Sequence, residues 1–322
     1  MLFATNRTPI NTDSFEPQSN IAFDIQNTQA HGQMLYCQRN ANNAYQHTGK
    51  AAFFEQLTNY VFNGHIIFYL HGFNCTNEKE IFPDTIKMQS GFDQLSSDLE
   101  VKVVPLIWPC DDDSILALAD DYFDDQRAAD ASETAFALFI EDLVHWQNAQ
   151  LSAEAKQKVH FLIHSMGTRV FYKSLTRYRQ TMGLTLKNLA NNIFLVAPDV
   201  INTALEPECD ASDIVSVADN VVIYYAVDDL AMSASRLANS TKGELQERLG
   251  KLGAADITKL PENVYQVNCQ DFNNRFEFII GHRYFIRDMF NNISPVIYHM
   301  VDALEQGQIT PNVIDHHLYP EQ

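Results

Sequence analysis

Basic side chains are scarce in this sequence of 322 residues. Twenty-two Lys and Arg residues stand against 41 Asp and Glu residues, which gives a net charge of −19. A chain with this charge repels phosphate backbones and anionic membrane surfaces, and no cluster of Lys and Arg outweighs the repulsion. We therefore expect no nucleic acid among its partners.

Cysteine is also rare, and its five positions are scattered. No C-x-x-C pair occurs and the number is odd, whereas a disulfide framework or a zinc cage needs closer spacing. We expect reduced thiols, as in a cytoplasmic protein, and no metal site. The five residues are Cys37, Cys75, Cys110, Cys209 and Cys269.

Long apolar runs are missing as well. No run reaches the roughly 18 residues that a spanning helix needs. The first residues, from Met1 to Pro9, have neither the basic start nor the apolar stretch of a secretory signal peptide. These absences predict no integral membrane segment and a cytoplasmic location.

Short apolar runs do alternate with longer helical patterns. Several runs lack the alternation of apolar and polar residues, which is typical of parallel strands covered on both faces. Between them, Phe136, Phe139, Ile140 and Leu143 fall on one helix face behind Asp130 and Glu133, a capping pair for that helix. The expected strands are 66–70, 101–107, 159–163, 193–197, 221–226 and 264–267.

This order predicts an α/β fold: a mostly parallel, doubly wound sheet with helices on both faces. Weaker patterns at 3–5, 21–25 and 34–37 favour antiparallel edge strands at the N-terminus. Pro105 cannot donate to a sheet ladder, so we expect residues 101–107 to pair mainly before it. One domain over 1–322 is expected, with cap-like decorations near 108–130 and 230–260.

A nucleophile fits the turn after the third expected core strand. Residues 159–163 run directly into His164-Ser165-Met166-Gly167, and a helix follows. In α/β hydrolases the serine points out of such a sharp strand-to-helix turn, usually within G-x-S-x-G. Here Ile163 stands at the first glycine position, and Ser165 could instead be a plain N-cap of the helix.

A serine nucleophile needs a histidine base and an acid that orients it, in the chain order serine, acid, histidine. Asp229 and its neighbour Asp228 follow one expected strand, and Asp199 follows the strand before it. His282 comes after the last strand and is the candidate base. The alternatives are a surface or packing role for His282 and helix capping for the two neighbouring aspartates.

The negative charge that develops on the substrate needs two backbone N–H donors. One donor is expected from Met166, the residue after the serine. The other is expected from Phe73, because Gly72 lets the backbone turn closely after strand 66–70.

With these residues in place, the chain resembles a family of bacterial α/β hydrolases of unknown function. The resemblance implies a serine-hydrolase triad at Ser165, Asp229 and His282. It favours Asp229 over Asp228, because Asp229-Leu230-Ala231-Met232 is similar to the family's Asp-x-Ala-Leu. The strings that carry it are Phe3-Ala4-Thr5-Asn6-Arg7, His71-Gly72-Phe73-Asn74, Trp108-Pro109, His164 to Arg169, Ala197-Pro198-Asp199-Val200, Tyr224 to Met232, Arg248-Leu249-Gly250 and Gly281-His282-Arg283-Tyr284.

The expected activity is hydrolysis of a small-molecule carboxylic ester through an acyl-enzyme on Ser165, with no cofactor. An amidase or peptidase with the same triad is one alternative. The other is an inactive binding protein of the same fold, for which Ile163 is the best argument.

Acidic and histidine-rich segments outside the triad have simpler interpretations. Eight aspartates between 108 and 130 predict a solvated rim that could overhang the pocket and disfavour anionic substrates. His316-His317 fits a flexible tail better than a metal site. His71 and His164 are expected to pack beside the site. The aspartates are Asp111, Asp112, Asp113, Asp120, Asp121, Asp124, Asp125 and Asp130.

Overall fold

The computed structural model describes residues 1–10, 16–95, 99–110, 118–239, 246–307, 309 and 315–317. Its strands form one sheet in the order β11-β10-β9-β8-β7-β5-β6-β1-β3-β4-β2. The strands are β1 (Leu2–Arg7), β2 (Ser19–Ile21), β3 (Ala30–Arg39), β4 (Tyr45–His47), β5 (Gly64–Leu70), β6 (Glu100–Ile107), β7 (Val159–His164), β8 (Ala190–Val196), β9 (Ala218–Tyr225), β10 (Val264–Asn268) and β11 (Asp315–His317).

The centre of the sheet is parallel, as the unbroken apolar runs predicted. Strands β6, β5, β7, β8, β9, β10 and β11 pair in parallel. Every residue of β7 and β8 is buried. Burial of both side-chain rows requires cover on both faces of the sheet.

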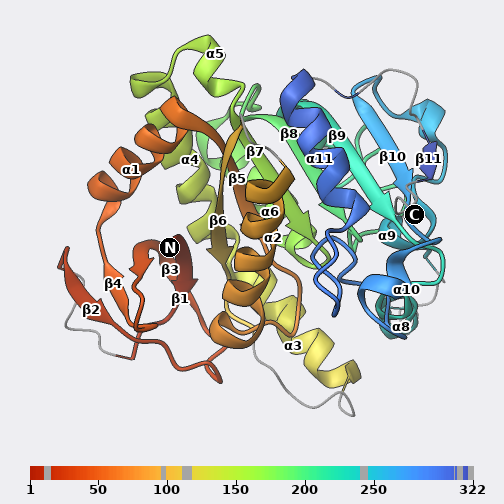
Figure 1. Cartoon of the computed structure of the whole chain (residues 1–322), viewed down its shortest axis with the longest axis horizontal. Coiled ribbons are helices and arrows are strands. Elements are labelled where there is room, and N and C mark those ends of the chain that lie inside the picture. The colour runs from red at the N-terminus through yellow and green to blue at the C-terminus, as the bar shows by residue number, and fades with distance from the viewer. Residues whose placement is uncertain are drawn as a thin grey trace.

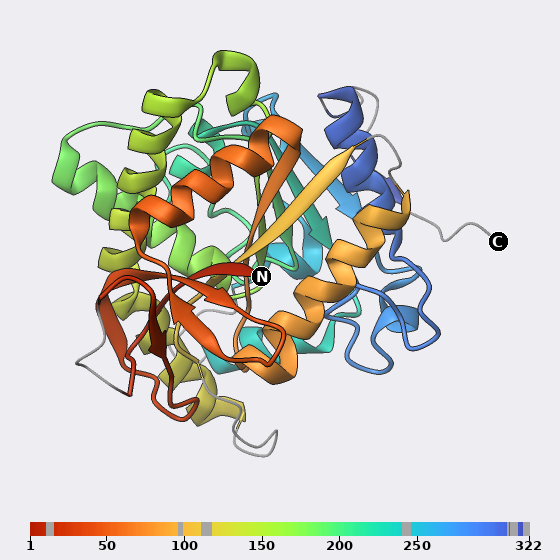
Figure 2. The ribbon, with the colours of Figure 1, turned by 60° about the vertical axis from the view of Figure 1, so that its left-hand side comes forward.

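Helices provide that cover from two sides (Figures 1 and 2). Helices α2 and α11 contact each other, and α4 contacts α6. The helices are α1 (Lys50–Asn63), α2 (Phe82–Leu95), α3 (Leu118–Ala131), α4 (Glu133–Gln150), α5 (Ala153–Lys156), α6 (Gly167–Met182), α7 (Asp213–Ser216), α8 (Leu230–Asn239), α9 (Leu249–Leu252), α10 (Asn273–Phe276), α11 (Pro295–Gln306), the π-helix η1 (Asn77–Ile81) and the 3₁₀-helix η4 (Ile257–Lys259). The α/β-hydrolase fold is confirmed.

The N-terminal strands extend the sheet beyond β6 (Figure 2). Strand β1 pairs in parallel with β6 and antiparallel with β3, so it lies inside the sheet rather than at its edge. Antiparallel pairs then join β3 to β4 and β4 to β2. Antiparallel N-terminal strands are therefore confirmed, and β2 is the edge strand.

Strand β6 pairs with β5 mainly before Pro105, as expected, and this ladder continues through Pro105 to Leu106, while β1 pairs with Leu106 and Ile107. Two local expectations are wrong. Asp130 does not cap α4. It lies in α3 and binds Arg169 of α6, while the N-cap Ser132 makes no side-chain capping bond.

The second wrong expectation concerns the C-terminal histidines. His316 and His317 form part of β11 and pair in register with Val267 and Asn268 of β10, where a flexible tail was expected. The open edge of β10 offers a ladder that a short segment can join.

Buried apolar side chains from both ends of the described chain, from Leu2 to Ile309, belong to one core. The single domain with cap-like decorations stays a prediction. Within the described residues, none of the helices combines the length and the apolar character that crossing a bilayer requires.

Candidate active site

Ser165 occupies a sharp turn between the end of β7 and the start of α6. Its φ of 51° lies in the left-handed region that L residues enter rarely. The backbone holds this conformation at both ends: the Ser165 amide donates to Val196 O (3.0 Å), and the Thr168 and Asp199 amides donate to Ser165 O. A strained residue that its surroundings hold in place is characteristic of functional turns.

The alternative role of Ser165 as an N-cap is wrong. Helix α6 begins at Gly167 with Met166 as its N-cap, and no side chain caps it. Ser165 Oγ has no hydrogen-bond partner among the described residues although the residue is only 1% exposed. Ile163, which pairs with Leu70 and Leu195 in the sheet, does not prevent this turn from forming.

Two glycines let other chain segments approach the turn. A Cβ on Gly167 would lie 2.6 Å from His71 O and 2.9 Å from Leu70 O. A Cβ on Gly72 would lie 2.9 Å from both His164 Nδ1 and Ser165 Cβ. These are distances that real Cβ atoms do not reach, so both positions need glycine for packing.

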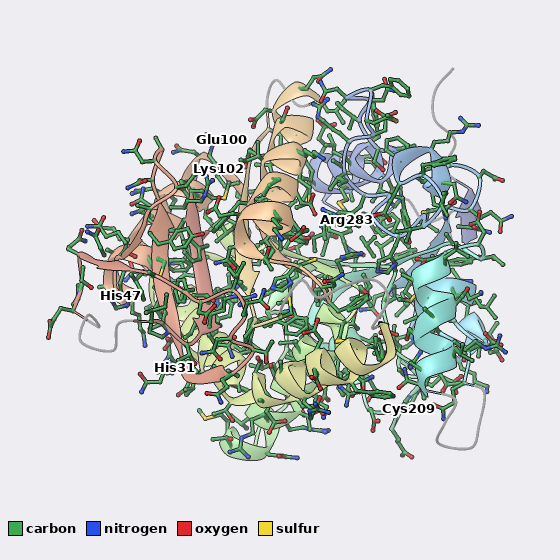
Figure 3. All side chains as sticks on the ribbon, turned by 90° about the horizontal axis from the view of Figure 1, so that it is seen from below. His31, His47, Glu100, Lys102, Cys209 and Arg283 are labelled. Atoms are coloured by element: carbon green, nitrogen blue, oxygen red, sulfur yellow. The ribbon has the colours of Figure 1, made fainter. Side chains whose placement is uncertain are left out.

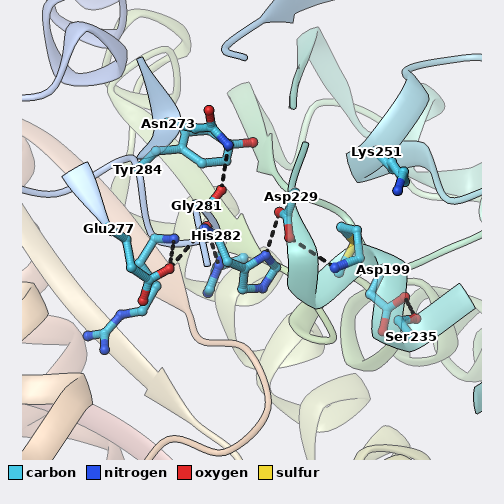
Figure 4. Close-up of polar contacts among 12 residues, drawn as sticks. Asp199, Asp229, Ser235, Lys251, Asn273, Glu277, Gly281, His282 and Tyr284 are labelled. Carbon is cyan, nitrogen blue, oxygen red and sulfur yellow. Dashed lines mark hydrogen bonds and ion pairs between the residues drawn. The ribbon is translucent and has the colours of Figure 1, made fainter. Parts of the chain in front are cut away.

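Asp229 and His282, 53 residues apart in sequence, meet in the interior. His282 Nδ1 lies 2.7 Å from Asp229 Oδ2, and Figure 4 shows this contact. The other oxygen of Asp229 accepts the amide of Met232 in the first turn of α8 (2.9 Å). The expected capping role of Asp229 and its contact with His282 therefore coexist, one on each carboxylate oxygen.

The backbone of His282 is held by a second acid. Glu277 accepts the amides of His282 (2.8 Å) and Arg283 (2.9 Å) through one carboxylate oxygen. This contact fixes the turn that carries the imidazole, so the ring is oriented from its backbone as well as from Asp229.

The residue His282 is only 6% exposed. Burial by itself lowers the pKa of His282, but the charge of Asp229 and its hydrogen bond outweigh this effect, with help from Glu277 and Asp199. The net result is a pKa above the ordinary 6.5. A raised pKa means that the site stabilises the imidazolium that a general base becomes when it takes a proton.

Ser165 and His282 line the same cavity. Both Ser165 Oγ and His282 Nε2 are buried and without a hydrogen-bond partner among the described residues. The structure therefore brings the serine and the histidine to one cavity, with Asp229 bonded to the histidine. The two unpaired atoms do not bond to each other here, and such bonds often tighten only around a substrate.

The two other aspartates considered as partners of His282 bond to other residues. Asp228 is exposed and accepts from Asn274 Nδ2. Asp199 accepts from Tyr122 and Ser235, and Figure 4 shows the Asp199–Ser235 contact apart from the Asp229–His282 contact.

Neither of the two amides expected to bind an oxyanion, Phe73 N and Met166 N, donates to a described residue. Phe73 lines the cavity that contains Ser165, and Met166 follows Ser165 directly. The carboxylate of Asp125 fixes the loop around Phe73 by accepting the amide of Asn74 (2.9 Å).

Comparison with known proteins gives one match. Residues 49–291 match a family described as alpha/beta hydrolase of unknown function (DUF900). This chain belongs to that family. No curated protein and no solved structure matches it. The match contains all five proposed site residues and leaves β1 to β4 outside its range.

Two helices form walls of the cavity in this alpha/beta hydrolase. Helix α3 contributes Tyr122 and Phe123, and α8 contributes residues from Leu230 to Ala238. Of the eight aspartates, Asp111, Asp112 and Asp113 lie outside the described residues, as do the side chains of Asp120 and Asp121.

The other three aspartates do not line the cavity. Asp124 pairs with Arg127, Asp125 holds the Phe73 loop, and Asp130 pairs with Arg169. The acidic groups at the cavity are instead Glu80, Asp199 and Glu277.

His71 and His164 pack beside the site, as expected. His71 stacks on Trp108 and contacts Gly72 O (2.7 Å), and burial lowers its pKa to about 3. Burial also lowers the pKa of His164 well below 6.5, with the nearby His282 adding to the effect. Both rings are therefore neutral near pH 7, so neither adds a positive charge beside His282.

Sequence reasoning missed several residues around the site. Tyr122, Ser235 and Arg248 surround Asp199, and Glu277 holds the turn of His282. Only the string Arg248-Leu249-Gly250 carried a signal, and it did not reveal which acid Arg248 meets. Among the described residues, no group of three or more His, Cys, Asp or Glu side chains could hold a metal ion.

Proposed function

We propose that this alpha/beta hydrolase is a serine hydrolase that cleaves carboxylic esters through an acyl-enzyme on Ser165. The observation that carries the proposal is the buried Asp229–His282 bond beside a serine whose hydroxyl is unpaired in the same cavity. A serine hydroxyl is a weak nucleophile, and this arrangement supplies the base that it needs.

The proposed reaction has two halves. His282 Nε2 takes the proton of Ser165 Oγ as the oxygen attacks the ester carbonyl, and Asp229 stabilises the imidazolium through Nδ1. The tetrahedral oxyanion is held by the amides of Phe73 and Met166. The imidazolium then returns its proton to the leaving alcohol, and water activated by His282 releases the acid.

The test is covalent labelling with a fluorophosphonate, which reacts only with an activated serine. We expect the natural protein to be labelled and S165A to be unlabelled. The matched control is S216A, at an exposed serine remote in sequence from the turn. A folded natural protein without label would contradict the proposal and favour a binding protein of the same fold.

Hydrolysis of p-nitrophenyl esters and of matched anilides then separates an esterase from an amidase or peptidase. Turnover of esters alone supports the proposal. Faster turnover of anilides would replace it with an amidase that uses the same three side chains.

A further inference from the structure

The cavity above Ser165 offers a substrate few polar partners. Its volume is about 710 Å³, which is within the range of pockets that enclose small ligands. Among its lining residues, the buried polar atoms without a partner are Ser165 Oγ, His164 Nδ1, His282 Nε2 and Arg283 Nε. They come from two short segments, 164–165 and 282–283, which carry the proposed chemistry.

The carboxylates that line the cavity already have partners in the protein. Glu80 accepts the amide (2.8 Å) and the hydroxyl (3.0 Å) of Thr76. Asp199 accepts from Tyr122 and Ser235, and Glu277 accepts two amides. A substrate is therefore not needed to satisfy these groups, and they give it no donor.

Apolar side chains form much of the remaining wall. Helix α8 turns one face to the cavity, and other apolar residues come from the Phe73 loop, from α3 and from the turn before His282. The apolar lining residues are Phe73, Phe123, Leu230, Ala231, Met232, Ala234, Leu237, Ala238 and Ile280.

Part of this wall is open to water. Leu237 is 70% exposed, Leu230 is 50% exposed and Ile280 is 41% exposed. The Leu230 amide donates to Ile280 O (3.0 Å), which fastens the start of α8 to the turn before His282. Exposed apolar side chains that continue into a reaction cavity are a favourable surface for an apolar ligand.

The charge around the cavity disfavours an anionic ligand. Glu80, Asp199 and Glu277 line it against the single guanidinium of Arg283. That guanidinium is paired with the buried Asp84. The net charge of −19 acts in the same direction.

From these observations we propose that α8 is the acyl-binding wall and that the substrates are uncharged esters whose acid part is an apolar chain longer than acetyl. The inference rests on the proposed function and narrows it to a substrate class. The chain lies along Leu230, Ala234 and Leu237, while the carbonyl reaches Ser165.

The first test is a chain-length series of p-nitrophenyl esters from acetate to dodecanoate. Burial of one methylene favours binding by about fourfold. We expect kcat/KM to rise at least tenfold between the acetate and the hexanoate and to level off when the cavity is filled. A flat or falling series would overturn the inference.

The second test places a larger side chain on the face of α8 that lines the cavity. In A234F the phenyl group occupies the path of the chain, so the ratio of kcat/KM for decanoate to that for acetate should fall at least tenfold. The matched control is R236F, on the same helix but outside the cavity lining, where the ratio should stay within twofold. An unchanged ratio in A234F contradicts α8 as the acyl wall.

The third test adds a charge at the far end of the chain. The mono-p-nitrophenyl ester of decanedioic acid matches the decanoate except for its terminal carboxylate. We expect its kcat/KM to be at least tenfold lower. Equal rates for the two esters would contradict the selection of uncharged chains.

These results separate the two proposals. Labelling of Ser165 together with a flat chain-length series leaves the serine hydrolase in place and overturns the acyl wall. Absence of both labelling and ester turnover overturns both.

Discussion

At the residue scale, Asp229 is the group on which the proposed role of His282 as a base depends most directly. It is fully buried and bonded to Nδ1 at 2.7 Å, whereas its neighbour Asp228 is exposed and bonded to Asn274. A shift of one position in the sequence therefore separates a buried carboxylate that contacts the imidazole from an exposed carboxylate that does not.

The pH dependence of kcat/KM follows from this contact. A base must be neutral to accept a proton, and the pKa of His282 is raised above 6.5, so activity should rise with pH through a midpoint above 6.5. In D229N the charge is removed and burial dominates, so the midpoint should move below that of the natural protein. The rate should fall by about 10⁴-fold. A pH-stat measures both.

The control for this experiment is D228N. Because Asp228 does not contact the imidazole, its variant should keep the midpoint and a rate within about twofold. A larger loss in D228N than in D229N would show that the acid has been assigned to the wrong residue.

Gly72 gives a second prediction at this scale. The added Cβ in G72A would press on His164 Nδ1 and Ser165 Cβ, both 2.9 Å away, and displace the serine. Since a displacement of about 1 Å can cost 10²-fold in rate, we expect kcat/KM to fall at least tenfold. G32A is the control, because a Cβ there meets nothing within 4 Å. Equal rates in G72A and G32A would argue against tight packing at the turn.

At the element scale, α9 contacts the backbone just after β8 and β9, the strands that lead to Asp199 and Asp229. The Gly250 amide donates to Pro198 O (2.9 Å), and the Ala226 amide donates to Gly250 O (3.1 Å). A Cβ on Gly250 would lie 2.3 Å from the carbonyl carbon of Ala197, just after β8. Helix α9 therefore sits directly on the backbone that leads to Asp199 and, through Ala226, toward Asp229.

G250A should separate α9 from this backbone. Overpacking of a dense interior typically costs 1–3 kcal/mol, and we expect a loss of about that size in the free energy of unfolding. Urea unfolding measures it, with G32A again as the control. A change below about 0.5 kcal/mol in G250A would mean that α9 can move away without cost.

At the scale of the whole molecule, a chain of polar side chains crosses four neighbouring strands near their first residues. His65 Nδ1 lies 2.9 Å from His160 Nε2, His160 Nδ1 contacts Asn192 (3.0 Å), and Asn220 donates to Asn192 (2.9 Å). These residues belong to β5, β7, β8 and β9. Burial lowers the pKa of His65 to about 4 and that of His160 well below 6.5.

This chain predicts a loss of stability in mild acid. A histidine whose pKa is lowered by folding stabilises the fold above pH 6.5, and this contribution is lost as the pH falls from 6.5 toward the folded pKa. Each such group costs about 1.4 kcal/mol per pH unit in that window. In H65N an amide replaces the titratable ring. The slope of the unfolding free energy against pH between 6.5 and 4.5 should therefore fall by up to about 1.4 kcal/mol per pH unit, the value for one proton.

Urea unfolding at several pH values gives the slope. The control is H31N. His31 belongs to β3, among the N-terminal strands (Figure 3), and is not part of the polar chain from His65 to Asn220. An unchanged slope in H65N would mean that His65 takes up no proton on unfolding.

Much of this molecule was readable from local pattern. The unbroken apolar runs predicted β5 to β10, and the step from the run at 159–163 into Ser165 predicted the turn, because hydrophobic period and strand-to-helix punctuation are properties of neighbouring residues. Where local signals were weak, prediction failed. Asp130 resembled a helix cap, yet its carboxylate accepts a hydrogen bond from Arg169 of another helix.

Spatial partners depended on the fold instead. Chain order proposed Ser165, Asp229 and His282, but only the packing of strand ends showed that Asp229 faces the imidazole while Asp199 meets Tyr122, Ser235 and Arg248. The apolar residues with which α8 lines the cavity were likewise invisible, because tertiary contacts decide whether a helical stripe lines a cavity or packs against another element. The sequence by itself determined the strands and the turn at Ser165, because these depend on neighbouring residues. Contacts between residues far apart in sequence, such as Asp229 with His282, were decided by the sheet that brings them together.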